Sequence, residues 1–148
     1  MILLSFGDHI LADRNPYCCT FSLFEETLQR FGIEADFIDA LVLDSVSKAL
    51  KPNTKTVYSE SPTNLTLKVI DIEKVAKEVH YYPTKSGEKI LVVLDNNFYS
   101  LIITKGLNFG ADIVIQSMTK YINRHIDVIG GIVFCHNKEM INAPFIQP

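Results

Sequence analysis

The chain has few cysteines and no long apolar run, and each shortage excludes a class of protein. Its 148 residues include three cysteines, of which Cys18 and Cys19 are adjacent and Cys135 is distant. An odd number in this arrangement argues against a disulfide framework and matches no zinc-ligand spacing. No apolar stretch is long enough to cross a bilayer, and the first ten residues lack the basic region of a signal peptide. We therefore expect a cytoplasmic protein without a metal site.

Charge of either sign is also scarce. Charged residues make up 21% of the chain and the formal net charge is −3. A net negative charge argues against nucleic acid and anionic membrane as partners. Hydrophobic residues, at 47%, are sufficient for a globular core, and the length is typical of one domain. We expect a single globular domain that binds neither nucleic acid nor membrane.

Three segments have apolar residues at helical spacing. They are 20–31, 45–50 and 72–79, and the spacing predicts a helix at each. Gly32 is a natural stop for the first helix, and Asp71 is placed to cap the third.

Strands are expected between and after these helices, at 33–38, 56–59, 90–94, 113–115 and 132–134. The last three of these segments are continuous apolar runs. Continuous apolar runs are typical of parallel strands that are covered on both faces. The alternation predicts an α/β protein with three α/β/α layers around a mostly parallel sheet.

Polar residues follow three of these predicted strands. The segments are ESPTN at 60–64, DNNF at 95–98 and SMTK at 117–120. Ligands of open parallel sheets gather beyond the carboxyl ends of the strands. Together the segments offer a carboxylate, an amide, two hydroxyls and an amine at one end of the sheet, which suits a phosphorylated aromatic cofactor held through an amine.

These segments belong to a longer series that includes GADIV at 110–114 and continues from SMTK through YINRHID to residue 127. The series resembles the successive motifs of the transsulfuration family of pyridoxal-phosphate enzymes of cysteine and methionine metabolism. The match runs in order from about Gly7 to Gly131, and the interval between Asp95 and Lys120 agrees without a gap. Within the family, the YCCT segment at 17–20 most resembles that of methionine γ-lyase.

The resemblance implies the fold and the cofactor. Residues 1–148 would form the core of a large domain like that of fold-type-I pyridoxal-phosphate enzymes, without the N-terminal arm and C-terminal domain of the family. Pyridoxal 5′-phosphate would form an internal aldimine with Lys120, whose amine must be partly neutral to move protons at the substrate. Asp95 would face the pyridine nitrogen. From residue type alone, the alternatives are a solvated lysine and a capping aspartate.

The resemblance also implies four further contacts with the cofactor. Ser117 and Thr119 would donate to its phosphate, although hydroxyls at strand ends are often turn residues. Asn64 would donate to its phenolic oxygen, or else form an Asx turn. Tyr17 would stack on the ring and act as an acid toward the leaving sulfur, the alternative being a core tyrosine. Cys19 would tune substrate choice or serve as inert buried filler.

The implied activity is that of a carbon–sulfur lyase. Such an enzyme would release a thiol, a 2-oxo acid and ammonia from a small sulfur-containing amino acid such as methionine, cystathionine or cysteine. A cystathionine γ-synthase-type enzyme and a non-catalytic truncated remnant stay open as alternatives. We expect a homo-oligomer or association with a full-length relative. His125 and Asp127 are interpreted as structural.

Five residues depart from the family pattern. Cys18 and Arg124 stand at glycine positions, Leu65 and Leu101 at proline positions, and Asn97 at a threonine position. A glycine position with positive φ would strain either of the first two replacements. Because the substrate-carboxylate clamp of the family is also expected to be missing, we predict little or no lyase turnover from this chain alone.

Overall fold

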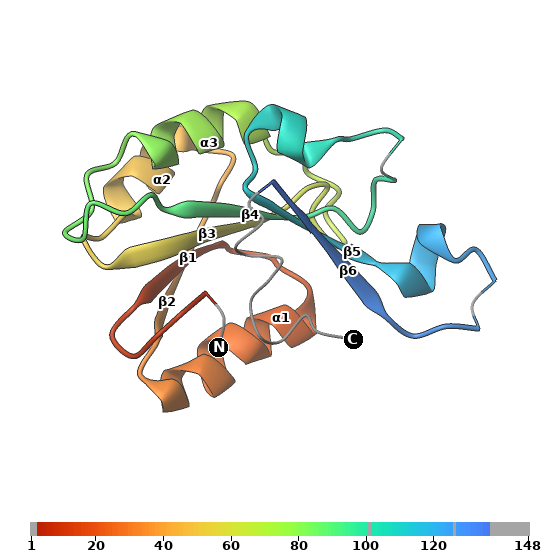
Figure 1. Cartoon of the computed structure of the whole chain (residues 1–148), viewed down its shortest axis with the longest axis horizontal. Helices are drawn as coiled ribbons and strands as arrows, with labels where there is room; N and C mark the ends of the chain where they lie inside the picture. The colour runs from red at the N-terminus through yellow and green to blue at the C-terminus, as the bar shows by residue number, and fades with distance from the viewer. Residues whose placement is uncertain (1–2, 101, 126, 137–148) are drawn as a thin grey trace.

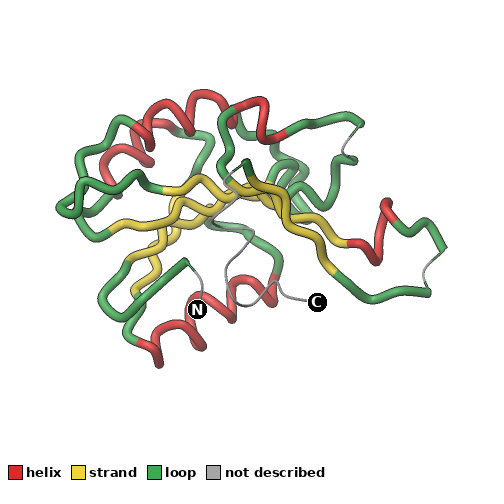
Figure 2. Tube along the Cα trace, in the orientation of Figure 1, coloured by secondary structure: helices red, strands yellow, loops and turns green. Residues whose placement is uncertain are grey.

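A six-stranded sheet forms the centre of the computed structural model, which describes residues 3–100, 102–125 and 127–136 (Figures 1 and 2). Its strands are β1 (His9–Asp13), β2 (Glu34–Ile38), β3 (Thr54–Glu60), β4 (Leu91–Asp95), β5 (Ile113–Ser117) and β6 (Gly131–Cys135). The spatial order is β2-β1-β3-β4-β5-β6. All neighbours pair in parallel except β5 and β6, which are antiparallel. The mostly parallel sheet is therefore confirmed.

Helices cover both faces of the sheet, which confirms the three-layer α/β/α arrangement (Figure 1). Helices α2 (Leu43–Ala49) and α3 (Ile72–His80) lie on one face, and the segment that begins with α1 (Cys18–Ser22) lies on the other. Alternate strand residues point to opposite faces. Leu11 and Val57 therefore join the core under α2 and α3, whereas Ile10 and Tyr58 join the core over the α1 segment. No helix within the described part of the chain is long and apolar enough to span a membrane.

Helix α3 forms where the apolar spacing predicts it. Val75, Ala76 and Val79 are buried against the sheet. The Asp71 side chain accepts a hydrogen bond of 3.1 Å from the backbone N–H of Lys74, which satisfies one of the free donors at the start of the helix. The predicted cap is thus confirmed.

The first helical segment is less regular than its apolar spacing predicts. It runs as α1, one turn of π-helix at Leu23–Thr27 and one turn of 3₁₀-helix at Leu28–Phe31, and it ends at Gly32 with φ 69°. The predicted apolar face consists of Phe21, Phe24, Leu28 and Phe31, and of these only Phe24 and Leu28 are buried. Phe21 is exposed on one side and lies 4.7 Å from the Phe37 ring, centroid to centroid.

Two strands differ from the prediction. The prediction that 132–134 is a parallel strand is wrong, because β6 pairs antiparallel with β5. A parallel connection usually runs through a crossover helix, whereas the described residues between these strands contain one turn, η4 (Met118–Ile122), and no longer helix. Strand β1 was not predicted at all, since polar His9 and Asp13 stand at its two ends. Both side chains are nevertheless buried.

Candidate functional site

Three neighbouring strands end at the same edge of the sheet. Glu60 is the last residue of β3 and pairs in register with Asp95, the last residue of β4. Asp95 in turn pairs with Ile115 of β5, two residues before that strand ends at Ser117. We call the polar residues at this edge the carboxyl-end cluster: Tyr17, Tyr58, Glu60, Asn64, Asp95, Asn97, Ser117, Thr119 and Lys120.

Asp95 is the buried carboxylate of this cluster, with only 5% of its surface exposed. Its Oδ2 accepts a bond of 2.8 Å from the Tyr58 hydroxyl, and its Oδ1 accepts one of 3.0 Å from the backbone N–H of Asn97. Burial raises the pKa of Asp95, and the two hydrogen bonds and the charge of Lys120 oppose that rise. Burial also raises the pKa of Tyr58, which keeps its hydroxyl a donor.

Lys120 brings an amine to the same edge. It lies in η4, where its own backbone departs from helical geometry with φ −94° and ψ −118°. Its side chain is exposed, and Nζ lies 5.0 Å from the centroid of the Phe98 ring. The Lys120 charge lowers the pKa of both Asp95 and Glu60, so the amine is within electrostatic reach of both carboxyl groups. Among the described residues, Lys120 forms no ion pair.

Ser117 and Thr119 are half-buried between β5 and the amine. The backbone N–H of Ser117 donates to the side-chain Oδ1 of Asn97. Asn97, which stands at a threonine position of the family pattern, therefore links the ends of β4 and β5. Thr119 Oγ1 accepts a bond of 3.2 Å from the backbone N–H of Gly130. A hydroxyl that accepts one bond still has its own hydrogen to donate.

Glu60 is a member of the site that the sequence reasoning missed. It is 2% exposed, and its Oε2 accepts a bond of 2.9 Å from the backbone N–H of Tyr17. The backbone N–H of Asn64 also donates to it. Burial, and then the neighbouring Asp95, raise the pKa of Glu60 to about 7. An acidic residue directly after a buried strand was the signal that could have singled it out.

Tyr17 and Asn64 border this carboxylate. Tyr17 precedes α1 and is 46% exposed, so the alternative of a core tyrosine is wrong. Hydrogen bonding to Cys19 is the main cause that raises the pKa of the Tyr17 hydroxyl. Asn64 is half-buried. Cys19 is exposed, so it is not inert buried filler.

The expected strain is found at one of the two replaced glycine positions. Arg124 has φ 65°, in the left-handed region. Cys18 begins α1 in helical conformation, so the prediction of strain there is wrong. Leu65 also has a positive φ, 62°, which a proline could not adopt. Leu101 lies outside the described residues.

His125 and Asp127 follow η4 and are both exposed. The Asn123 amide donates to the Asp127 carboxylate. This contact is local, within one loop after η4, and it is consistent with the structural interpretation of Asp127. No group of three or more metal-ligating side chains occurs in the described ranges either.

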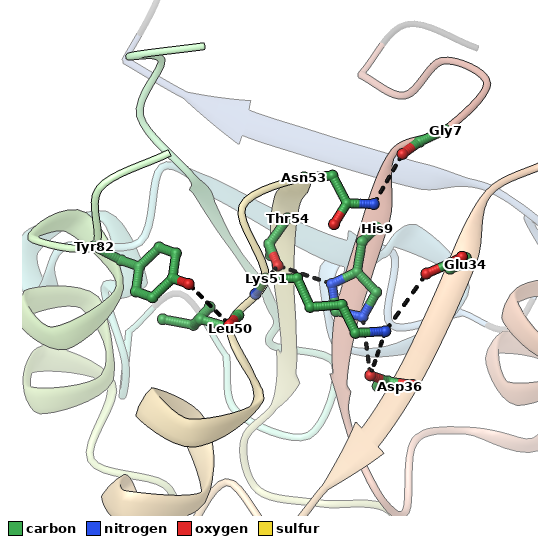
Figure 3. A network of polar contacts seen from close by, with 9 residues as sticks. All are labelled: Gly7, His9, Glu34, Asp36, Leu50, Lys51, Asn53, Thr54 and Tyr82. Carbon is green, nitrogen blue, oxygen red and sulfur yellow. Dashed lines mark hydrogen bonds and ion pairs between the residues drawn. The ribbon is translucent and has the colours of Figure 1, made fainter. Parts of the chain in front are cut away.

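A second set of polar residues lies at the opposite end of the sheet (Figure 3). We call it the amino-end cluster: His9, Glu34, Asp36, Lys51 and Thr54. The buried His9 ring contacts Thr54 Oγ1 at 2.8 Å through Nδ1 and Asp36 Oδ2 at 3.3 Å through Nε2. Lys51 Nζ pairs with Asp36 at 2.8 Å and with Glu34 at 3.4 Å. Each charge of this cluster therefore has a partner of opposite sign.

Known proteins are similar to this chain over nearly its whole length. A family described as Cys/Met metabolism PLP-dependent enzyme matches residues 1–147. The L-methionine gamma-lyase of Fusobacterium nucleatum subsp. polymorphum is 46% identical over 138 residues, which cover 93% of this chain and 33% of that protein. The cystathionine gamma-lyase of Bacillus subtilis (strain 168) is 39% identical over 140 residues, which cover 95% and 35%.

Solved structures are also similar to this chain over most of its length. The crystal structure of metB from Corynebacterium glutamicum matches with a TM-score of 0.86 and 38% identity, over 94% of this chain and 34% of that one. The cystathionine gamma-lyase from Lactobacillus plantarum, complexed with L-serine, matches with a TM-score of 0.85 and 36% identity, over 93% and 35%. The chain thus spans about a third of the length of the relatives that it matches.

Proposed function

This chain belongs to the family of Cys/Met metabolism PLP-dependent enzymes, and we propose that residues 1–148 are the cofactor-binding core of a carbon–sulfur lyase of the methionine γ-lyase type. The observation that carries the proposal is the pair formed by Lys120 and Asp95: an accessible amine within electrostatic reach of a buried carboxylate. The 46% identity to an L-methionine gamma-lyase supports the choice of lyase type.

The side chains at the carboxyl-end cluster fit pyridoxal 5′-phosphate by their chemistry. Asp95 would accept from the protonated pyridine nitrogen, and the Tyr58 hydroxyl that donates to Oδ2 supports the ionised carboxylate. Ser117 and Thr119 would donate to the phosphate, and Asn64 would donate to the phenolic oxygen. Lys120 would hold the cofactor through its amine.

Bound pyridoxal phosphate supplies an electron sink for the α-carbon of an amino acid. The Lys120 amine would accept and return protons at the α and β carbons of the substrate, as a positioned general base and acid. The Tyr17 hydroxyl would give a proton to the leaving sulfur, and the raised pKa of Tyr17 keeps that proton in place at neutral pH. A small sulfur-containing amino acid is the proposed substrate.

A non-catalytic role is the second candidate, because Arg124, four residues after Lys120, has a strained left-handed backbone with φ 65°. In that case the chain would still bind the cofactor, or would associate with a second copy or a full-length relative, without turning over substrate. Positioning of a substrate can contribute roughly 7–11 kcal/mol to lowering a barrier, so a poorly positioned substrate would not be turned over.

The test is direct. Purified chain is mixed with pyridoxal phosphate, reduced with borohydride and digested, and the labelled lysine is located by mass spectrometry. We expect the label on Lys120; a label spread over surface lysines would contradict the proposal. Release of 2-oxo acid from methionine, cystathionine and cysteine then separates the two candidates. We expect a slow release, far below the roughly 1 per second of ordinary enzymes. Release above the background without protein would favour the lyase, and no such release would favour the non-catalytic role.

A further inference from the structure

The Glu60 carboxylate joins three separate segments of the chain. It stands at the end of β3, accepts from the backbone N–H of Tyr17 just before α1, and accepts from the backbone N–H of Asn64 in the loop after β3. In the sheet it pairs in register with Asp95. The buried Glu60 side chain therefore holds the backbones of Tyr17 and Asn64 close to Asp95, and all three are proposed cofactor contacts.

The backbone N–H of Tyr17 lacks a hydrogen-bond partner within α1, and the Glu60 carboxylate supplies one. Tyr17 is the residue before the first turn of α1, and its backbone is extended, with φ −51° and ψ 139°. Backbone N–H groups at the start of a helix have no partner within the helix. A charged acceptor forms a stronger bond with such a donor than a neutral one does. Because Tyr17 itself is 46% exposed, core packing alone does not fix its position.

We propose that Glu60 is a positioning residue of this site, whose carboxylate fixes the backbones of Tyr17 and Asn64 and so sets where their side chains meet the cofactor. The part that concerns the cofactor rests on the proposed function. The attachment of the two backbones to Glu60 does not, because it is a property of the chain alone.

The charges around Glu60 make this attachment depend on pH. Asp95 on β4 disfavours the ionised carboxyl group of Glu60, and Lys120 on η4 favours it. The buried Tyr58 and the nearby Tyr17 hydroxyl have raised pKa values and stay neutral near pH 7. Burial and Asp95 together bring the pKa of Glu60 to about 7. The ionised form, which is the better acceptor, therefore becomes dominant as the pH rises through neutrality.

Amide hydrogen exchange, read residue by residue by NMR, tests the attachment without cofactor. The variants are Glu60→Gln, Glu60→Asp and Glu60→Ala, with Glu26→Gln as the matched control on an exposed glutamate. In Glu60→Ala and in the shorter Glu60→Asp we expect the protection of the Tyr17 and Asn64 amides to fall by about tenfold or more at a fixed pH near 8. The control should keep wild-type protection.

The second measurement is the dissociation constant for pyridoxal phosphate in wild type and Glu60→Gln. Wild-type affinity should exceed that of Glu60→Gln by a ratio that grows from about pH 6 to about pH 8, as Glu60 ionises. If the two amides keep wild-type protection in Glu60→Ala, or in Glu60→Asp should Glu60→Ala not fold, the inference is overturned. If they lose protection but wild type binds no cofactor at Lys120, the attachment stands and the proposed function fails.

Discussion

The two ends of the sheet carry polar clusters whose carboxyl groups differ in electrostatic character. At the amino-end cluster, a hydrogen bond to Lys51 lowers the pKa of Asp36, and the same contact raises the pKa of Lys51. At the carboxyl-end cluster, burial raises the pKa of both Glu60 and Asp95. The contacts at the amino end therefore favour the ionised forms of Asp36 and Lys51, whereas burial at the carboxyl end disfavours the ionised forms of Glu60 and Asp95.

We infer from this difference that the amino-end cluster is structural, and it supports the proposed functional role of the carboxyl-end cluster. Charges that are paired stabilise the fold, and the contacts of Lys51 with Asp36 and Glu34 are of this kind. Two carboxyl groups buried side by side cost stability, and such groups collect at sites where a ligand supplies the missing charge. Glu60 and Asp95 pair in register, so the second description applies to them. A bound cationic pyridine ring would relieve that cost.

The largest expected effect compares a lysine from each end. Lys120→Ala should abolish the borohydride-stable attachment of pyridoxal phosphate, because Lys120 is the lysine that acts on both Asp95 and Glu60. Lys51→Ala should leave attachment unchanged, because Lys51 pairs with Asp36 at the other end. Absorbance of the bound cofactor and peptide mapping measure both variants. Equal loss in the two variants would show that attachment is non-specific.

The next effect concerns stability and pH. The folded-state pKa of Glu60, about 7, lies above its ordinary value of 4.5, so its contribution is fully present below pH 4.5 and is lost as the pH rises to 7. Wild type should lose up to about 3 kcal/mol of unfolding free energy over this range through Glu60. Glu60→Gln cannot ionise and should not show this loss. Urea unfolding near pH 5 and pH 8 measures the difference, and parallel pH profiles for the two proteins would contradict it.

Backbone strain gives a third comparison. Arg124 and Gly32 both have left-handed backbones, with φ 65° and 69°. Arg124→Gly should stabilise the chain by about 1 kcal/mol, because a side chain is strained in this region. Gly32→Ala should destabilise it by a similar amount, about 1 kcal/mol, and its Cβ would also lie 2.3 Å from the Phe6 ring. Thermal unfolding checks both changes, and a lower melting temperature for Arg124→Gly would be evidence against strain at that position.

The smallest effect is expected at the amino-end cluster. Asp36 has a lowered pKa, so its contribution is present above its ordinary pKa and is lost as the pH falls through the lowered value. Its side chain is 46% exposed, and a screened ion pair at such a position contributes only about 0.5 kcal/mol. Asp36→Asn should therefore reduce stability slightly at neutral pH, opposite in sign to Glu60→Gln. A gain of stability would show that the two ends do not differ as described.

Much of the sheet could be predicted from local pattern. The strands that end at Asp95 and Ser117 contain continuous apolar runs, at 90–94 and 113–115, and such runs are how parallel strands covered on both faces are recognised. Strand β1 could not be predicted this way, because the burial of His9 and Asp13 depends on partners distant in sequence. The His9 ring is satisfied by Thr54 and Asp36, which lie on two other strands.

The order of the motifs along the chain, by itself, determined the family and the residues proposed to hold the cofactor, since Asp95 and Lys120 lie in segments that local sequence identifies. Tertiary structure alone decided the direction of β6 and the role of Glu60. The reason is physical: burial and charge at Glu60 come from Asp95, Tyr17 and Lys120 on three other segments. Only when the sheet brings those segments together does an ordinary carboxyl group become a buried acceptor with a pKa near neutrality.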